Sequence, residues 1–238
     1  MDKIEKIVRW LKGQIDSSGV NGYIMGLSGG LDSAVCAGLI KKATSNALGL
    51  ILPIESDPID IEDAKEIADI FDLKCQQFDL TEVFNGLVKI LPGADRVSRG
   101  NIKARLRMIV LYYYANINHF LVCGTGNKTE IMLGYFTKYG DGACDVLPLG
   151  DLYKYQVREI AGDIGVPVKI IEKIPTAGLW PGQSDEAEIG YEYSQIDTTL
   201  EQIAQCRIQG DCANKLQQMI IQSEHKRQPP KIFYFNES

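Results

Sequence analysis

The chain has 238 residues, of which 45% are hydrophobic and 24% charged, and these ordinary globular values exclude a disordered chain. Its 25 basic and 31 acidic residues give a net charge of −6, which argues against a nucleic-acid partner, because sequence-independent binding to a nucleic-acid backbone needs an excess of basic residues. The N-terminus has no uninterrupted apolar segment, so we expect no signal peptide and no membrane partner. Six cysteines without a C-x-x-C pair exclude the usual zinc frameworks and predict reduced thiols in the cytoplasm.

Helices and strands alternate along the chain. The apolar spacing predicts helices at residues 4–15, 31–42, 59–71, 101–118, 127–136 and 151–164, and one more that Thr81 opens as its N-cap. It predicts strands at residues 22–27, 47–52, 75–80 and 120–123. Strands joined by helical crossovers indicate an α/β fold, a doubly wound, Rossmann-like parallel sheet with helices on both faces. We expect residues 1–238 to form one domain.

The composition of the sequence changes after residue 175. Residues 176–194 combine glycines with acidic side chains, and we interpret them as a candidate lid. Two helices are expected after it, near residues 193–205 and 211–225. In a parallel sheet, ligands bind at the carboxyl ends of the strands. Two glycine-containing loops follow such ends, after the first and the fourth predicted strands.

The loop after the first strand carries the strongest chemical signal. Glycines let backbone N–H groups turn around an anion, and the following helix adds its positive end. An aspartate at the helix start suits a metal bound to the same phosphates. The loop lacks the G-K-[ST] of a Walker A motif, and its plainer alternative is a strand-to-helix turn with an aspartate cap. Its residues are Gly26, Leu27, Ser28, Gly29, Gly30, Leu31, Asp32 and Ser33.

This loop resembles the pyrophosphate-binding loop of the ATP pyrophosphatase superfamily. Further stretches, taken with it, resemble the NAD synthetase family in order through nearly the whole chain. These stretches are residues 100–108, 124–130, 137–142, 173–177 and 225–227.

The resemblance implies the last step of NAD biosynthesis. The carboxylate of deamido-NAD would attack the α-phosphate of ATP, giving an adenylate and pyrophosphate, and ammonia would then displace AMP. ATP would be a co-substrate, Mg²⁺ the cofactor and a homodimer the assembly. Glutamine-using members of the family carry an amidase domain upstream. Because the phosphate loop begins near residue 26, we expect no such domain and predict free ammonia, or ammonia from a separate protein, as the nitrogen donor.

The resemblance also assigns roles to single residues. Asp32, Glu130 and Lys154 would form the catalytic group, with the two carboxylates on magnesium. Thr125, Lys154 and Thr176 would bind ATP together with the phosphate loop. The residues expected to bind deamido-NAD are Arg105, Lys138, Asp145, His225 and Lys226.

Each assignment has a plainer alternative. Glu130 could face solvent on a short helix, Lys138 could belong to a solvated turn, and the basic residues 225–227 could complement a helix C-terminus. Arg105 and Arg107 lie two apart and point to different helix faces, so we interpret Arg107 as a surface or ion-pair residue.

Two other functions stay open from the residues alone. One is another ATP pyrophosphatase, such as a tRNA-modifying thiolase or a GMP-synthetase-like amidase. The other is a non-catalytic module that binds adenine nucleotides. The proposed pair of magnesium carboxylates distinguishes an enzyme from such a module, and the net charge of −6 argues against a tRNA substrate.

Overall fold

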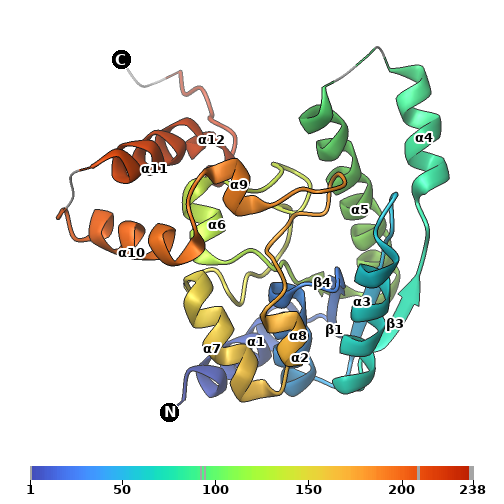
Figure 1. Ribbon diagram of the computed structural model, residues 1–238. Coiled ribbons are helices and arrows are strands. Elements are labelled where there is room, and N and C mark those ends of the chain that lie inside the picture. The colour runs from blue at the N-terminus through green and yellow to red at the C-terminus, as the bar shows by residue number, and fades with distance from the viewer. Residues whose placement is uncertain (1, 92, 94, 208–209, 236–238) are drawn as a thin grey trace.

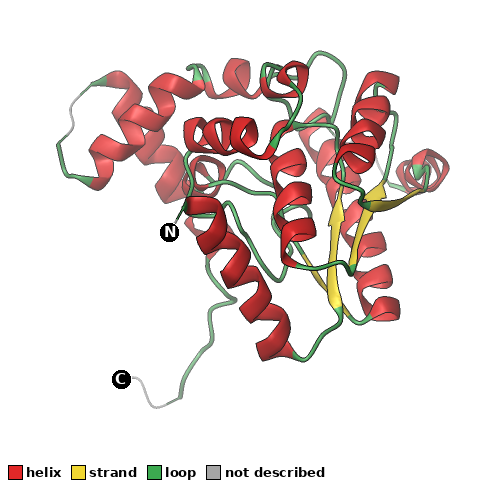
Figure 2. Ribbon diagram, turned by 90° about the horizontal axis from the view of Figure 1, so that it is seen from below, coloured by secondary structure: helices red, strands yellow, loops and turns green. Residues whose placement is uncertain are grey.

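The computed structural model describes residues 2–91, 93, 95–207 and 210–235. Its centre is a four-stranded parallel sheet with the strand order β3-β2-β1-β4 (Figure 1). Helices flank the strands on both sides (Figure 2), which confirms the predicted α/β class. The strands are β1 (Gly22–Gly26), β2 (Ala47–Ile51), β3 (Lys74–Gln77) and β4 (Phe120–Val122).

The helices of the first half of the chain surround this sheet. They are α1 (Lys3–Ser18), α2 (Leu31–Ala43), α3 (Pro58–Ile70), α4 (Thr81–Ile90) and α5 (Arg96–Asn118). Helix α5 begins earlier than the predicted residue 101, because the carboxylate of Asp95 accepts a hydrogen bond from Ser98 N at 2.7 Å and caps it. The prediction that Thr81 is an N-cap is wrong. Thr81 is the first helical residue, and Asp79 Oδ1 accepts its N–H at 2.8 Å.

After β4, the regular elements of the described residues are all helices, joined by loops. These helices are α6 (Lys128–Leu133), α7 (Lys154–Ile164), α8 (Val168–Ile171), α9 (Asp185–Ile189), α10 (Tyr193–Ala204), α11 (Asp211–Gln222) and α12 (Glu224–Arg227). Helix α6 ends well before the predicted residue 136. Its C-cap Gly134 has a φ of 65°, and a Cβ there would lie 2.1 Å from the Cβ of Ser223, so both the backbone turn and the close approach require glycine.

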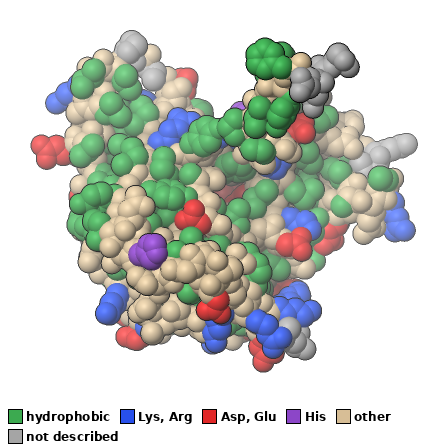
Figure 3. All heavy atoms as spheres, turned by 180° about the vertical axis from the view of Figure 1, so that it is seen from behind, with side chains coloured by type: hydrophobic (Ala, Val, Ile, Leu, Met, Phe, Trp, Pro, Cys, Tyr) green, Lys and Arg blue, Asp and Glu red, His purple; other side chains and the backbone are tan. Residues whose placement is uncertain are grey.

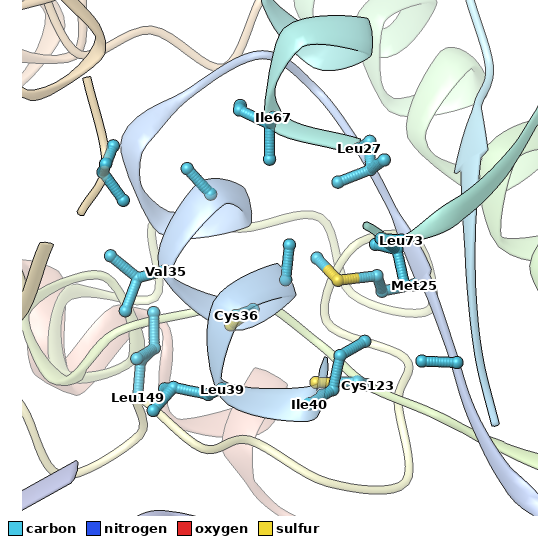
Figure 4. Close-up of a cluster of buried hydrophobic side chains, with 14 of the residues drawn as sticks. Met25, Leu27, Val35, Cys36, Leu39, Ile40, Ile67, Leu73, Cys123 and Leu149 are labelled. Atoms are coloured by element: carbon cyan, nitrogen blue, oxygen red, sulfur yellow. The ribbon is translucent and has the colours of Figure 1, made fainter. Parts of the chain in front are cut away.

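The two faces of the sheet are buried under different helices. Because side chains alternate along a strand, Met25 points to a core shared with α1, α2 and α7, whereas Ile24 points to a core shared with α5. Figure 4 shows the first core, in which Met25 and Leu27 lie near helix α2, and α2 itself contributes Val35 and Cys36. Cys36 is a free thiol there, as are the other five cysteines. Both faces are therefore covered, as in a doubly wound sheet.

A separate core joins the C-terminal helices. Leu133 of α6, Ile189 of α9, Leu200 of α10 and Leu216 of α11 are buried together. In Figure 1 these helices stand beside the sheet, on the side away from α4 and α5. Among the described helices, none has both the length and the apolar character needed to cross a membrane. Helix α6 thus connects the carboxyl edge of the sheet to the helical part of the molecule.

Candidate active site

A cavity of about 440 Å³ lies at the carboxyl ends of β1, β2 and β4, where the fold predicts a ligand. Its wall combines the loop after β1, one side of α5, the start of α6 and α7, and residues 173–180. Most of the sequence-predicted ATP and magnesium residues line it, although Gly29 does not. The predicted residues in the lining are Gly26, Leu27, Ser28, Gly30, Leu31, Asp32, Ser33, Thr125, Glu130, Lys154, Thr176 and Lys226.

The phosphate loop is held by its own side chains. Ser28 and Ser33 join their hydroxyls at 3.0 Å, and Ser33 Oγ donates to the carbonyl of Gly30 at 2.9 Å. Gly29 has a φ of 77°, and a Cβ there would lie 2.2 Å from the carbonyl oxygen of Asp60, so no other residue fits. Helix α2 begins directly after the loop and directs its positive end at the cavity.

Lys154 lies between the two predicted magnesium carboxylates. Its Nζ forms an ion pair with Asp32 Oδ2 and lies 3.4 Å from Glu130 Oε1. The lysine side chain is only 4% exposed. Asn127 Nδ2 donates to the other oxygen of Asp32 at 3.0 Å. The structure therefore brings Asp32, Glu130 and Lys154 into one cluster with a formal charge of −1, next to the phosphate loop.

Burial and charge act together on the pKa values in this cluster. Burial raises the pKa of Glu130 to about 8, although the ammonium of Lys154 works against the shift. Burial alone would lower the pKa of Lys154, but the charges of Asp32 and Glu130 reverse this and raise it. Lys154 therefore stays a cation at neutral pH. A fixed buried cation beside a phosphate loop can neutralise charge that develops on a phosphoryl group.

The oxygen donors in the cluster fit magnesium. Mg²⁺ is commonly bound by one or two protein carboxylates together with substrate phosphates. Asp32 and Glu130 supply two such carboxylates at the phosphate loop. The described residues hold no group of three or more His, Cys, Asp or Glu that could enclose a metal by themselves. This donor set suits an ion that shares its coordination with a nucleotide.

A buried network braces the cluster from behind. Thr129 donates its hydroxyl to Asp197 Oδ1 and accepts the backbone N–H of Lys154 at 3.1 Å. Asp197 Oδ2 accepts the N–H of Tyr155 at 2.9 Å, so a residue of α10 caps the first turn of α7. The sequence reasoning missed Asp197. The sequence pattern that could have revealed it is an acidic residue on the apolar stripe of its helix, between Ile196 and Leu200.

Asp185 is a second buried carboxylate that the sequence reasoning missed. It lines the cavity, accepts the N–H of Ala177 at 3.1 Å and receives the hydroxyl of Tyr193 at 3.2 Å. Burial raises its pKa, and the nearby charge of Lys154 opposes this. Asp185 thereby fixes the backbone beside Thr176, one of the predicted ATP residues.

The residues predicted to bind deamido-NAD do not all lie in one place in the structure. Lys226 lines the cavity, where Nζ donates to the carbonyls of Gly134 and Phe136 at 2.7 and 2.8 Å. Arg105 donates to the carbonyl of Lys138 at 3.2 Å, and Lys138 Nζ donates to the carbonyl of His225. Arg105 and His225 are exposed, Lys138 is partly buried, and the three lie together outside the cavity lining.

Asp145 lies apart from both groups. Its Oδ2 accepts the backbone N–H of Val122 in β4 at 2.7 Å, and its Oδ1 accepts the hydroxyl of Tyr112 at 3.2 Å. It is not part of the cavity lining. In this structure its carboxylate extends the hydrogen bonding of the edge strand.

The expectation for Arg107 is wrong. Arg107 lines the cavity, and its Nε donates to the carbonyl of Leu52 at 2.9 Å. No ion pair to Arg107 is formed by the described residues. Arg107 lies on the same side of α5 as the cavity-lining Ala104 and Leu111, so of the two neighbouring arginines the second points inward.

Known proteins are similar to this chain in sequence and in architecture. The model of the NAD synthase family matches residues 3–230. The chain belongs to the NAD synthase family. An NH(3)-dependent NAD(+) synthetase from Finegoldia magna is 44% identical over 98% of this chain and 95% of that protein. A protein of the same name from Sulfurisphaera tokodaii is 45% identical over 95% of this chain and 86% of that protein.

Solved structures of family members superimpose over nearly the whole chain. The NMN synthetase from Francisella tularensis has a TM-score of 0.91 and 36% identity, with 98% of each chain covered. The NH3-dependent NAD synthetase from Campylobacter jejuni, in complex with the nitrate ion, has a TM-score of 0.85 and 28% identity over 98% of this chain and 100% of that one. A glutamine-dependent NAD+ synthetase from Acinetobacter baumannii has a TM-score of 0.68 and 26% identity, and the match covers 97% of this chain but 46% of that one.

Proposed function

We propose that this chain is a C–N bond-forming ligase that makes NAD from deamido-NAD, ATP and ammonia, with Mg²⁺ as cofactor. The observation that carries the proposal is the buried cluster of Asp32, Glu130 and Lys154 beside the phosphate loop. Full-length similarity at 44% identity to an NH(3)-dependent NAD(+) synthetase supports the choice of substrates.

The chemistry of an amidation explains why such a cluster is useful. A carboxylate is a poor electrophile, so one of its oxygens is first made into a leaving group. That oxygen attacks the α-phosphorus of ATP, and the bond to pyrophosphate breaks. Ammonia then attacks the carbonyl carbon of the adenylate, loses a proton, and AMP leaves with the original carboxylate oxygen.

The residues of this chain hold charge in place during these steps. The loop of residues 28–33 and the start of α2 would bind the phosphates, and Lys154 would lie beside them as a fixed cation. Asp32 and Glu130 would hold the magnesium, which supplies further positive charge to the phosphates when bound. Thr125 and Thr176 line the same cavity and would contact ATP from the end of β4 and from the segment after α8.

Ammonia is the proposed nitrogen donor, and one domain the proposed organisation of residues 1–238. The NH(3)-dependent relatives from Finegoldia magna and Sulfurisphaera tokodaii are matched over 95% and 86% of their length, whereas the glutamine-dependent Acinetobacter protein is matched over 46%. The six free thiols fit a reducing compartment, and we keep the cytoplasm as the proposed location.

A homodimer is the proposed assembly. Ile109, Tyr113 and Ile117 are exposed at i, i+4 spacing along α5, so they form an apolar row on one side of the helix. Seen from behind, hydrophobic side chains gather on the side of the molecule that carries α4 and α5 (Figure 3). Contiguous apolar surface of this kind is typical of an interface between protein chains.

One observation favours a second candidate acceptor. The Francisella structure with a TM-score of 0.91 is named an NMN synthetase. Four of the five residues predicted to bind deamido-NAD lie outside the cavity lining, namely Arg105, Lys138, Asp145 and His225. The same amidation of nicotinic acid mononucleotide would give NMN and would need fewer contacts to the acceptor.

A product assay distinguishes these functions. Purified protein is incubated with ATP and magnesium, with ammonium or glutamine, and with either deamido-NAD or nicotinic acid mononucleotide. We expect NAD, AMP and pyrophosphate with deamido-NAD and ammonium. Faster formation of NMN would select the second candidate. AMP and pyrophosphate without an amidated product would indicate another ATP pyrophosphatase, and no turnover would indicate a nucleotide-binding module.

A further inference from the structure

Arg107 lies on the cavity-facing side of α5 among apolar residues. Ala104 and Leu111, one turn before and one turn after it, line the cavity together with its neighbour Met108. An arginine within an apolar stripe is expected to be paired, because a charge removed from water needs compensation. Whether the protein supplies a partner for this charge therefore decides whether Arg107 has a structural role.

The guanidinium of Arg107 makes one hydrogen bond to the described residues. Nε donates to the carbonyl of Leu52 at 2.9 Å, and no carboxylate among the described residues comes within 4.0 Å of its nitrogens. Burial lowers the pKa of Arg107, and the more distant charge of Asp141 works against this. The two terminal nitrogens, which carry four N–H donors, are left for a ligand.

Lys103 shows what a structural cation on the same helix looks like. Its side chain is 5% exposed, and Nζ forms an ion pair of 2.8 Å with Glu55. It also lies 5.1 Å from the centre of the Phe84 ring. Lys103 does not line the cavity. One turn further along α5, Arg107 is only partly buried, and it has no carboxylate partner among the described residues.

The Nε bond sets the direction of the guanidinium. Because Leu52 follows β2, its carbonyl fixes the inner edge of the planar group at the carboxyl end of the sheet. The outer edge then faces the same cavity that Ser28 and Thr125 line. A planar fork of this kind matches the two oxygens of a phosphate or a carboxylate, and a lysine ammonium does not reproduce that geometry.

We propose that Arg107 binds an oxyanion, phosphate or carboxylate, of one of the two nucleotide substrates, and is a substrate-binding residue on the α5 side of the cavity. The inference rests on the proposed function for the identity of those nucleotides. The bound anion supplies the negative charge that the protein itself does not place beside this guanidinium.

Calorimetric binding tests the proposal without turnover. Magnesium-ATP and deamido-NAD are titrated separately into the wild-type protein and into Arg107→Met and Arg107→Lys. Because a charge-assisted hydrogen bond contributes about 1.5–3 kcal/mol, we expect the affinity of Arg107→Met for one nucleotide to fall about tenfold or more, with the other within about twofold of wild type. Arg107→Lys should recover part of the loss. The nucleotide affected identifies the source of the anion.

A stability measurement separates binding from a structural role. Arg107→Met removes a partly buried charge that no carboxylate of the described residues pairs, so its ligand-free unfolding temperature should stay at or above the wild-type value. Lys103→Met leaves Glu55 without its partner and should lower that temperature. Arg99→Met is the control for affinity, because Arg99 lies on the same helix, stacks on Phe84 at 5.6 Å and does not line the cavity.

Two results would overturn the proposal. One is wild-type affinity of Arg107→Met for both nucleotides. The other is an equal loss for both, together with an unfolding temperature lowered as far as in Lys103→Met. A wild-type protein that binds both nucleotides and forms neither NAD nor NMN would instead contradict the proposed function, while the comparison of affinities would still decide the role of Arg107.

Discussion

The two sides of the cavity balance their charges differently. On the side formed by α2, α6 and α7, Lys154 lies between Asp32 and Glu130, so the cluster is largely neutralised by the protein itself. On the side formed by α5, Arg107 has a backbone carbonyl and no carboxylate among the described residues. Internal pairing keeps charged groups in place before ligands arrive, whereas an unpaired charge in the cavity wall indicates where a ligand completes the site.

The paired side should be the more sensitive to substitution. Asp32→Asn removes the charge that contacts Lys154 and one of the two proposed magnesium ligands. We expect kcat to fall about 100-fold or more, as for the loss of other groups that stabilise transition-state charge. Turnover is measured at saturating substrates, with circular dichroism as the test of folding.

Asp72→Asn is the matched control for that prediction. Asp72 is an exposed carboxylate that pairs with Lys41 at 2.9 Å and does not line the cavity. Its variant should keep wild-type turnover. Near-normal turnover of Asp32→Asn would contradict the role of the cluster.

The bracing network should matter less than the cluster that it supports. Thr129→Val removes the hydroxyl that joins Asp197 to the backbone of Lys154. We expect kcat to fall about tenfold and the free energy of unfolding to fall by about 1–3 kcal/mol, because two buried partners lose a hydrogen bond. Thr129→Ser keeps the hydroxyl and should restore most of the turnover.

Tyr23→Phe separates positioning from stability. The hydroxyl of Tyr23 is buried in the core under α1 and donates to the carbonyl of Leu11 at 2.6 Å. Its loss should cost similar stability and leave kcat unchanged. If the kcat of both variants followed their stability, Thr129 would have no specific role at the site.

The segment after α8 should be sensitive at its contact with α5. A Cβ at Gly100 would lie 3.0 Å from the Cβ of Leu179, and the guanidinium of Arg96 lies 4.6 Å from the centre of the Trp180 ring. Gly100→Ala improves helix propensity by about 1 kcal/mol but displaces Leu179. We therefore expect unchanged or higher stability, a KM for ATP raised about threefold, and faster proteolysis within residues 176–184.

Gly162→Ala is the control for this effect. Gly162 lies in α7, and no atom would lie within 4 Å of a Cβ there. This variant should gain stability without a change in KM or in proteolysis. Equal behaviour of the two variants would mean that the 176–184 segment does not depend on this contact.

The smallest effect concerns the ion pairs beneath the phosphate loop. Asp63 accepts hydrogen bonds from Lys173 at 2.6 Å and from Lys169 at 2.9 Å. Burial would raise the pKa of Asp63, but these lysines outweigh it and the pKa is lowered. A lowered folded-state pKa stabilises the protein above the ordinary Asp value of about 3.9 and loses that contribution as pH falls through the lowered value.

Asp63→Asn tests this linkage. Thermal unfolding is followed between neutral and acid pH for the wild type and the variant. The variant should be less stable near neutral pH, and the difference between the two proteins should shrink below about pH 4. A difference that grew toward acid pH would contradict the sign of the shift.

The phosphate side could be predicted from sequence because its residues are nearly consecutive. A strand, the loop of residues 26–33 and a helix determine one another through local geometry, and Asp32 follows from its position at the helix start. The sheet itself followed from the alternation of strands and helices. Its order of β3-β2-β1-β4 keeps the loops after β1 and β4 side by side.

The other side could not be predicted in the same way. Arg105 and Arg107 differ only in which way α5 turns over the sheet, and that depends on packing against β1 and β4. Asp197 reaches the start of α7 because a separate core docks α10 there, which no local pattern specifies. The assignments of Arg105, Lys138, Asp145 and His225 to deamido-NAD remain predictions.

The most direct test of the proposed reaction follows the oxygen atoms of the acceptor. Deamido-NAD labelled with ¹⁸O in both carboxylate oxygens is turned over with ATP, magnesium and ammonium, and the products are examined by mass spectrometry. The proposed reaction predicts one ¹⁸O in the phosphate of AMP, one in the amide of NAD, and none in pyrophosphate. Formation of ADP with ¹⁸O in inorganic phosphate, or of unlabelled AMP, would contradict activation of the acceptor at the α-phosphate.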